Sequence, residues 1–402
     1  MINYSKKLQP IFDTLIAHSI QPIIVGGFVR DSLLGISSKD IDIELYNLES
    51  YEQLQKILKK FGSINSVGKS FGVCKLSFNS LELDFSFPRK DNKVAQGHKG
   101  FDIKIYTQMD FKTASTRRDF TINAMGFDIK NKILLDPFNG LNDLHNKVLR
   151  VVDNKKFAED PLRILRAMQF CARFNLKVDQ NLIEICSIMI QKNTLQQLSI
   201  ERIFLEFEKL LIQANKPSLG IEFLKNIHAF DYFLELKDSS FYTQKLTALD
   251  KVKSDFLHVK LTLLCYDLTK NNLINFLNKL TLDKTLIKKT YLLYKYKDIF
   301  LDTIYIENYN IYKVAEYISV KEVLLIHTAI NNNKIYKDIQ QKAIELNVYE
   351  KKLNAIIEGK DLIVLGLKPS PKFSIILKKC YEAQMKGEFN TKEEGIKWLK
   401  NI

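Results

Sequence analysis

The chain has 402 residues with 46% hydrophobic content, which is enough for several buried cores and excludes a short disordered or disulfide-stapled protein. Lys and Arg number 60 against 46 Asp and Glu, and the resulting net charge of +14 excludes an acidic tail-like protein and favours polyanionic partners. RNA and a membrane surface both attract such a charge. No apolar run is long enough to cross a bilayer, and residues 1–15 lack a signal peptide's apolar stretch, so the sequence predicts a protein without a membrane anchor.

The five cysteines are odd in number and lie scattered in apolar contexts. Such spacing argues against a disulfide framework and against a zinc site. A reducing cytoplasm is the compartment that this pattern favours.

The first informative segment is a short strand that ends in a glycine pair. Ile23, Ile24 and Val25 form an apolar β-branched run, and Gly26 and Gly27 follow it at once. Glycine lets the backbone approach a ligand closely. The spacing of Val29, Leu33 and Leu34 then predicts a helix with Arg30 in its first turn, where free N–H groups favour an anionic phosphate.

The next strand carries acidic residues on one face. In the segment 39–46 the side chains alternate, so Asp40, Asp42 and Glu44 point to one side while the intervening apolar residues point into a core. Neighbouring carboxylates repel each other unless a cation lies between them, and Mg²⁺ prefers such oxygen ligands. Alternatively, an Asp-x-Asp pair on its own is a solvated feature of a half-exposed strand. The preceding glycine turn favours the metal interpretation, with two Mg²⁺ ions held by Asp40 and Asp42.

A third carboxylate is expected from a neighbouring strand over residues 81–87. Alternation there puts Glu82, Asp84 and Ser86 on one face. We choose Asp84 as the third catalytic carboxylate and keep Glu82 as the alternative. Both are solvated strand residues if no metal binds.

Two polar segments follow. Residues 89–103 are polar and contain glycine, which predicts a long loop near the site. In RRDFTINAM, at 117–125, Arg117 and Arg118 are suited to phosphate or ribose, Asp119 to capping a helical turn or accepting from a ribose hydroxyl, and Asn123 to either role.

Residues 159–174 have helical periodicity, and Pro161 is compatible with a first helical turn. Asp160 and Arg163 are three residues apart and are therefore predicted to share a face. Glu159 lies four residues before Arg163 and is expected to hold its guanidinium. Alternatively, these charges form ordinary salt bridges on a surface helix.

Beyond residue 155 helical signals dominate. The sequence predicts an α+β head with a small mixed sheet over residues 1–155, followed by an all-α neck (156–215), body (216–300) and tail (301–402).

Taken in order, these motifs resemble the class II nucleotidyltransferases, which comprise the tRNA CCA-adding enzymes and the bacterial poly(A) polymerases. GGFVRD with the following DID resembles the catalytic signature of that family. RRDFTINAM, LLDPFNGLNDL, EDPLRILRAMQFCARF and ERIFLEFEKLL follow in the expected order. Together they span about half the chain.

The resemblance implies template-independent addition of CMP and AMP to the 3′ end of tRNA, with CTP and ATP as substrates and pyrophosphate as the product. Asp160 and Arg163 would then select the base, because their acceptors and donors match the amino group and ring acceptor of cytosine and adenine and mismatch guanine and uracil. The implied nucleotide-binding residues are Gly26, Gly27, Arg30, Arg118, Asp119, Asn123, Glu159, Asp160, Arg163 and Arg166.

The last stretch, residues 359–389, resembles the C-terminal segment of many CCA-adding enzymes. Its lysines are candidates for gripping the phosphates of the tRNA acceptor arm, a contact that carries no sequence information: Lys368, Lys372, Lys378 and Lys379. The sequence suggests no protein partner. Three alternatives remain open, namely a split enzyme that adds only CC or only A, a poly(A) polymerase, and an RNA-binding protein without catalytic activity.

Overall fold

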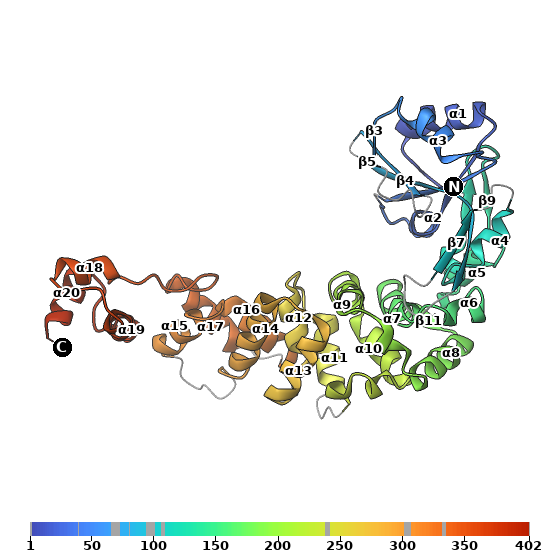
Figure 1. Ribbon diagram of the computed structural model, residues 1–402. Helices are drawn as coiled ribbons and strands as arrows, with labels where there is room; N and C mark the ends of the chain where they lie inside the picture. Colours follow the sequence, from blue (N-terminus) through green and yellow to red (C-terminus); the bar gives the residue numbers. More distant parts are fainter. Residues whose placement is uncertain are drawn as a thin grey trace. The chain divides into compact units, whose positions relative to one another are not determined.

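The computed structural model describes residues 2–38, 40–65, 73–79, 81–93, 101–105, 109–237, 242–300, 307–331 and 335–401 (Figure 1). The chain forms two compact units, Met1–Leu234 and Glu235–Ile402. The first unit contains the sheet and the second is helical, so the predicted fold class, a mixed-sheet head followed by helices, is confirmed. The division between units falls within the segment that the sequence assigns to the body, and the four domain boundaries remain predictions.

The head is built on a seven-stranded mixed sheet in the order β3-β4-β5-β2-β1-β8-β9. Only β2 and β5 run parallel, and every other neighbouring pair is antiparallel. Since β2 is a central strand, its side chains have neighbours on both sides. The strands are β1 (Gln21–Val25), β2 (Ile41–Tyr46), β3 (Ser63–Asn65), β4 (Val73–Phe78), β5 (Leu81–Ser86), β8 (Gly126–Asp128) and β9 (Ile133–Leu135).

The two faces of this sheet differ in composition, as the alternation in the sequence predicted. Ile24, Ile43 and Leu45 are fully buried on one face. Of the nearby helices, α1 (Gln9–Ala17) packs against β1, α2 (Gly27–Leu33) packs against β1 and β2, and α3 (Tyr51–Leu58) packs against α1. The opposite face carries the acidic residues of β2. There, a small core of Ile23, Val25, Tyr46 and Ala114 packs around α4 (Phe111–Ser115).

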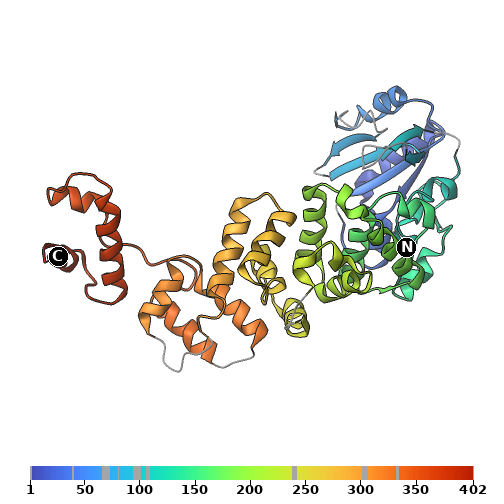
Figure 2. The same ribbon diagram turned by 60° about the horizontal axis from the view of Figure 1, so that its bottom comes forward.

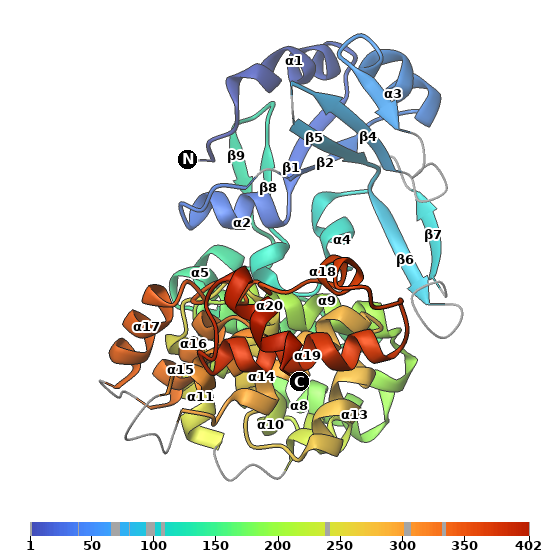
Figure 3. The same ribbon diagram turned by 90° about the vertical axis from the view of Figure 1, so that its left-hand side faces the viewer.

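The prediction of a long loop over residues 89–103 is wrong at both ends of that segment, where the structure has strands. β6 (Arg89–Lys93) and β7 (Phe101–Ile105) form an antiparallel pair, from Arg89 opposite Ile105 to Lys93 opposite Phe101 (Figure 3). Backbone hydrogen bonds hold such a ribbon together, so it needs no apolar alternation in the sequence. Residues 94–100 lie outside the described part of the chain.

The rest of the first unit is helical around α7 (Leu162–Phe174), which packs against α9 and α10. Close packing with α10 depends on Gly220, because a Cβ there would lie 2.7 Å from the Met168 carbonyl oxygen. The other elements are α5 (Gly140–His145), α6 (Asn154–Ala158), α8 (Gln180–Gln191), α9 (Ile200–Glu208), α10 (Pro217–Asn226) and the short parallel pair β10 (Val148–Leu149) and β11 (Lys177–Val178).

The second unit shows helices and no strand in its described residues (Figures 1 and 2). α12 packs against α11, α14 and α16, and the last three helices gather around Ile357, Cys380 and Phe389. The helices are α11 (Tyr242–Lys251), α12 (Leu257–Leu264), α13 (Lys270–Leu280), α14 (Lys284–Tyr296), α15 (Asn308–Ala315), α16 (Val320–Ile330), α17 (Ile335–Glu345), α18 (Gly359–Val364), α19 (Lys372–Met385) and α20 (Lys392–Lys400). Throughout the described ranges, every helix falls short of the length and apolarity needed to cross a membrane.

Candidate active site

The glycine pair forms a tight turn between β1 and α2. Gly26 has φ +72°, a left-handed conformation that favours glycine, and its N–H donates to the Met125 carbonyl oxygen at 3.2 Å. A Cβ at Gly26 would lie 2.7 Å from Nη1 of Arg118. The turn therefore requires glycine for its backbone conformation and also to admit the arginine from the RRDFTINAM motif.

The register of the sheet brings two of the predicted carboxylates side by side. Asp42 on β2 pairs with Asp84 on the parallel strand β5, so both side chains lie on the same face. Asp40 immediately precedes β2 and is exposed, as is Asp42. Asp84 accepts a hydrogen bond from Lys75 Nζ at 2.8 Å, whereas Glu82 accepts from Ser77 Oγ at 2.7 Å and lies before the paired segment. This register favours Asp84 over Glu82 as the third carboxylate.

The charge around Asp42 is predominantly negative. Although its side chain reaches solvent, the surrounding protein removes part of its hydration and raises its pKa, and the charges of Asp84, Asp40 and Glu44 add to this effect. Arg118 counteracts them in part. A bound cation would relieve this repulsion, so the donor set fits a metal ion.

Glu44 shares that face but is 1% exposed and belongs to a cationic cluster. Its Oε1 accepts from Arg117 Nη2 at 2.6 Å and from Arg118 Nη2 at 3.5 Å, and its Oε2 accepts from the Tyr46 hydroxyl at 3.0 Å. Burial would raise the pKa of Glu44, but the two arginines and the Tyr46 hydroxyl outweigh it and hold the pKa below its ordinary value. Glu44 is thus ionised and neutralised within the protein.

Asp119 and Asn123 form the centre of a buried polar chain. Asp119 accepts from its neighbour's N–H, from Asn123 Nδ2 at 3.0 Å and from Arg166 Nε at 2.6 Å. Burial would raise its pKa, but Arg166 and Arg163 lower it to about 2. Asn123 Oδ1 in turn accepts from Arg30 Nη1 at 2.6 Å. Hydrogen bonds therefore connect four of the predicted nucleotide-binding residues in one chain, in the order Arg30, Asn123, Asp119 and Arg166.

Arg30 is 4% exposed, and the structure places its guanidinium inside the unit. It donates to Asp31 Oδ1 at 2.8 and 2.6 Å and lies over the rings of Phe170 and Phe174 on α7, 5.0 and 4.4 Å from their centres. The sequence indicated a role in the phosphate-binding helical turn. The side chain instead connects α2 to α7.

The charges at the start of α7 also have partners within the protein. Asp160 precedes the first helical residue and accepts from the free N–H of Leu162 at 3.1 Å and from Arg202 Nη2 at 3.4 Å. Arg163 donates to the main-chain carbonyls of Lys156 and Arg117.

That Glu159 holds the Arg163 guanidinium remains a prediction. Two main-chain carbonyls accept from this guanidinium, and Glu159 also forms an ion pair with Lys156 at 3.1 Å. The carbonyls come from segments that precede α7, so the spacing of charges along the helix does not reveal them.

Sequence reasoning missed Arg202, Glu44 and Tyr46 as parts of this site. Arg202 lies on α9, in the motif ERIFLEFEKLL, which had been recognised without a role for any residue. Its side chain reaches Asp160 because α9 packs against α7. The two residues of β2 follow the alternation of Asp42, which was a usable signal.

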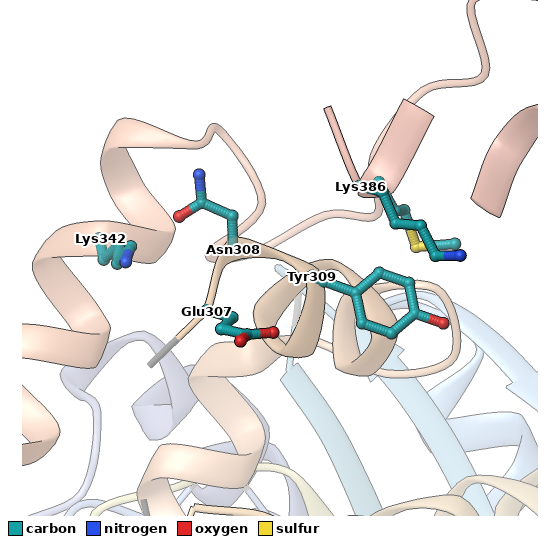
Figure 4. A pocket seen from close by; sticks show the side chains of 6 residues that line it. Glu307, Asn308, Tyr309, Lys342 and Lys386 are labelled. Atoms are coloured by element: carbon teal, nitrogen blue, oxygen red, sulfur yellow. The ribbon is translucent and has the colours of Figure 1, made fainter. Parts of the chain in front are cut away.

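The second unit contains a separate cavity of about 570 Å³. Figure 4 shows its lining side chains, which come from α17, from the end of α19 and from the residues at the start of α15. One acid, two lysines and a tyrosine make the lining mixed in charge, and none of the predicted site residues belongs to it: Glu307, Asn308, Tyr309, Lys342, Met385 and Lys386.

Comparisons with known proteins bear on this geometry. Residues 23–150, which contain the glycine turn, the acidic strand and RRDFTINAM, match the poly A polymerase head domain family. Residues 251–399 match tRNA nucleotidyltransferase domain 2. The multifunctional CCA protein of Neisseria gonorrhoeae is 34% identical over 222 residues, which cover 55% of this chain and 52% of that protein. The head thus resembles that of poly A polymerases, and the second unit resembles a tRNA nucleotidyltransferase domain.

A second relative is the CCA-adding enzyme of Francisella tularensis, 32% identical over 209 residues that cover 51% of this chain and 54% of the relative. The chain thus spans about half the length of the curated relatives it matches.

Solved structures are similar over nearly the whole chain. The Bacillus stearothermophilus CCA-adding enzyme in complex with CTP aligns with a TM-score of 0.76 and 20% identity, covering 99% of this chain and 98% of that one. The Thermotoga maritima CCA-adding enzyme complexed with tRNA aligns with a TM-score of 0.68 and 21% identity, covering 98% and 94%. At this identity the likeness shows a shared fold.

Proposed function

We propose that this protein adds CMP and AMP stepwise to the 3′ end of tRNA, using CTP and ATP. The terminal ribose 3′ hydroxyl attacks the α-phosphorus of the nucleotide, a new phosphodiester bond forms, and the bond to the outer phosphates breaks to release pyrophosphate. The observation that carries this proposal is the pairing of Asp42 with Asp84 beside the glycine turn, in a head of the poly A polymerase type. Relatives named for CCA addition indicate the product.

Mg²⁺ fits the oxygen donors of Asp40, Asp42 and Asp84. No three His, Cys, Asp or Glu side chains converge into a complete metal site within the residues described. A catalytic Mg²⁺ does not require this, since it commonly takes one or two carboxylates and completes its shell with water and substrate phosphates. We propose that Asp40 and Asp42 hold two such ions, which would lower the charge on the attacking hydroxyl and on the leaving pyrophosphate.

The protein's own residues would orient the nucleotide. Gly26 and Gly27 let the triphosphate approach the backbone, and Arg118 lies at that turn. Asp119, Asn123 and Arg166 are proposed to bind the ribose and to align it with the base. Arg30 is proposed to support this cluster through Asn123.

Base selection is assigned to the start of α7. The acceptors of Asp160 and the donors of Arg163 match cytosine and adenine, and Glu159 is proposed to keep the local charge balanced through Lys156. Guanine and uracil would leave a buried donor or acceptor unpaired, which costs roughly 1–3 kcal/mol for each contact. Selection of this kind requires no nucleic acid template.

The tRNA acceptor arm is the proposed partner, and the net charge of +14 supports it. The four tail lysines proposed to grip its phosphates are exposed around α18 and α19. The five buried cysteines are unpaired thiols, and we propose a cytoplasmic location for the protein.

The test is a stepwise incorporation assay. The protein is incubated with Mg²⁺ and tRNA transcripts that end before CCA, after CC, or with an unrelated 3′ sequence, and is offered CTP, ATP or both. Three nucleotides added to the first transcript, followed by arrest, are expected. Addition of only two or only one identifies a split enzyme, and long A tracts on every transcript identify a poly(A) polymerase.

A further inference from the structure

We propose that Glu44 is a positioning residue for the outer phosphates of the nucleotide, because it fixes the Arg118 guanidinium against the glycine turn. This inference rests on the proposed function. It gives a role to a buried ion cluster that the metal ligands and the base-reading residues do not use.

Glu44 carries its carboxylate inside the protein. It lies two residues after Asp42 on β2, and its pairing with Ile23 keeps it on the same face of the sheet. A carboxylate that is 1% exposed loses its hydration, at a cost that only several hydrogen bonds offset. Arg117, Arg118 and Tyr46 supply them.

Arg118 lies between Glu44 and the glycine turn. Its Nη2 faces Glu44, while its Nη1 lies 2.7 Å from where a Cβ at Gly26 would be. The guanidinium is therefore clamped between a buried carboxylate and the backbone of the turn. The positive charge of Arg118 also acts to lower the pKa of Asp42, which opposes the effect of the neighbouring carboxylates.

One donor of the Arg118 guanidinium has no hydrogen-bond acceptor in the described part of the chain. This donor is Nε, which is buried. An unpaired buried donor is costly, and its best acceptor at a cationic group is an anionic oxygen. Phosphate oxygens match the fork of a guanidinium, so a triphosphate lying along the glycine turn would satisfy this donor.

Glu44 acts through Arg118 and touches no substrate. Its loss should therefore weaken the contact with the outer phosphates and leave recognition of the base and of tRNA unchanged. Glu44→Gln keeps the size of the side chain and removes its charge. Tyr46→Phe is the graded comparison, because it removes only the hydroxyl bonded to Oε2, leaves the charge of Glu44, and keeps the ring in the core formed with Ile23 and Val25.

The experiment compares the binding of CTP and CMP, without tRNA and with Mg²⁺, by the parent, E44Q and Y46F proteins. We expect E44Q to bind CTP about tenfold more weakly and to leave CMP within about twofold of the parent. Y46F should weaken CTP binding less than E44Q does, because Glu44 keeps its charge and both of its arginine partners. In turnover with tRNA, the KM for CTP and ATP should rise by the same factor in E44Q.

Two outcomes overturn the proposal. If E44Q is folded by circular dichroism and binds CTP as the parent does, or more tightly, then Glu44 does not position the arginine for phosphate. If CTP and CMP weaken equally, Glu44 only supports the fold. The binding arms need no catalysis, so a parent protein that binds CTP over CMP but extends no tRNA would contradict the proposed function alone.

A double-variant cycle identifies the residue through which Glu44 acts. Arg118→Lys keeps the charge and loses the fork. If Glu44 works by holding that fork, adding E44Q to R118K should weaken CTP binding by less than about twofold further. Fully additive losses would mean that Glu44 acts independently of Arg118, and would refute the proposal.

Discussion

Two parts of the first unit are highly charged, namely the carboxylate edge formed by Asp40, Asp42 and Asp84 and the start of α7. Their charges are compensated in different ways. At the edge, Asp42 lies beside Asp84 and near Asp40, and this repulsion contributes to its raised pKa. At the start of α7, Asp160 and Arg163 already have partners within the protein. Under the proposed function, a metal ion at Asp42 would supply missing compensation, whereas a base at α7 would have to replace existing hydrogen bonds. Selection there is a difference between two sets of contacts.

The largest expected effect comes from removing a metal ligand. Asp42→Ala should lower kcat on the order of a thousandfold, since metal charge stabilisation is worth several kcal/mol, and should leave tRNA binding nearly intact. Single-turnover incorporation and filter binding measure the two quantities. Asp13→Ala, at an exposed carboxylate on α1, is the control and should retain full activity. Loss of tRNA binding along with incorporation would indicate misfolding or a different role for β2.

The next effect distinguishes the two candidates for the third carboxylate. Because Asp84 pairs with Asp42 and Glu82 does not, Asp84→Ala should lower kcat by about a hundredfold and Glu82→Ala by less than about twofold. Measuring kcat at saturating CTP for both variants decides between them. The reverse order would move the third role to Glu82 and would show that strand register does not determine it.

The residues proposed to select the base, at the start of α7, should show a smaller and more specific effect. Arg163→Ala removes the proposed donors, so discrimination against UTP should fall by about tenfold while the Kd for tRNA changes less than twofold. The ratio of kcat/KM for CTP to that for UTP is the measurement. Arg202→Ala, which frees Asp160 without touching Arg163, should relax selection less. An unchanged UTP ratio in R163A would contradict the template role of α7.

The smallest effect is on the stability of the metal-free protein. The native state raises the pKa of Asp42, so folding favours its protonated form, and stability falls as pH rises from the ordinary pKa through the raised one. Asp42→Asn removes that penalty and should raise Tm at neutral pH by about 1 °C without metal. Added Mg²⁺ should stabilise the parent more than the variant. A metal-free D42N protein that melts below the parent would contradict the charge argument at the edge.

The strands were predictable from local pattern, but their neighbours were not. Alternation alone predicted which side of β2 is acidic and which is apolar. Asp84 lies 42 positions after Asp42, so their pairing depends on two distant strands being adjacent and parallel, which no local period encodes. The β6–β7 hairpin was missed because a polar ribbon relies on backbone pairing and carries no apolar period.

At α7 the chemistry of the residues was predictable and their partners were not. Helical spacing placed Pro161 at the start of the helix, as observed. The acceptors of Arg163 are main-chain carbonyls, one of them 46 residues away, and carbonyls leave no trace in the identity of a side chain. Long-range contacts of this kind are determined by packing, so a sequence read in isolation attributes them to the nearest suitable charge.

Arg30 connects the glycine turn to α7, and this connection bears on how the two ends of the site respond to ligands. Its guanidinium bonds to Asn123 and stacks on Phe170 and Phe174, so a shift of α7 and a shift of the glycine turn each disturb the same group. A ligand that shifts either element would therefore change affinity at the other. By thermodynamic reciprocity, a base that improves phosphate binding must itself be bound more tightly when the phosphates are present, and by the same factor.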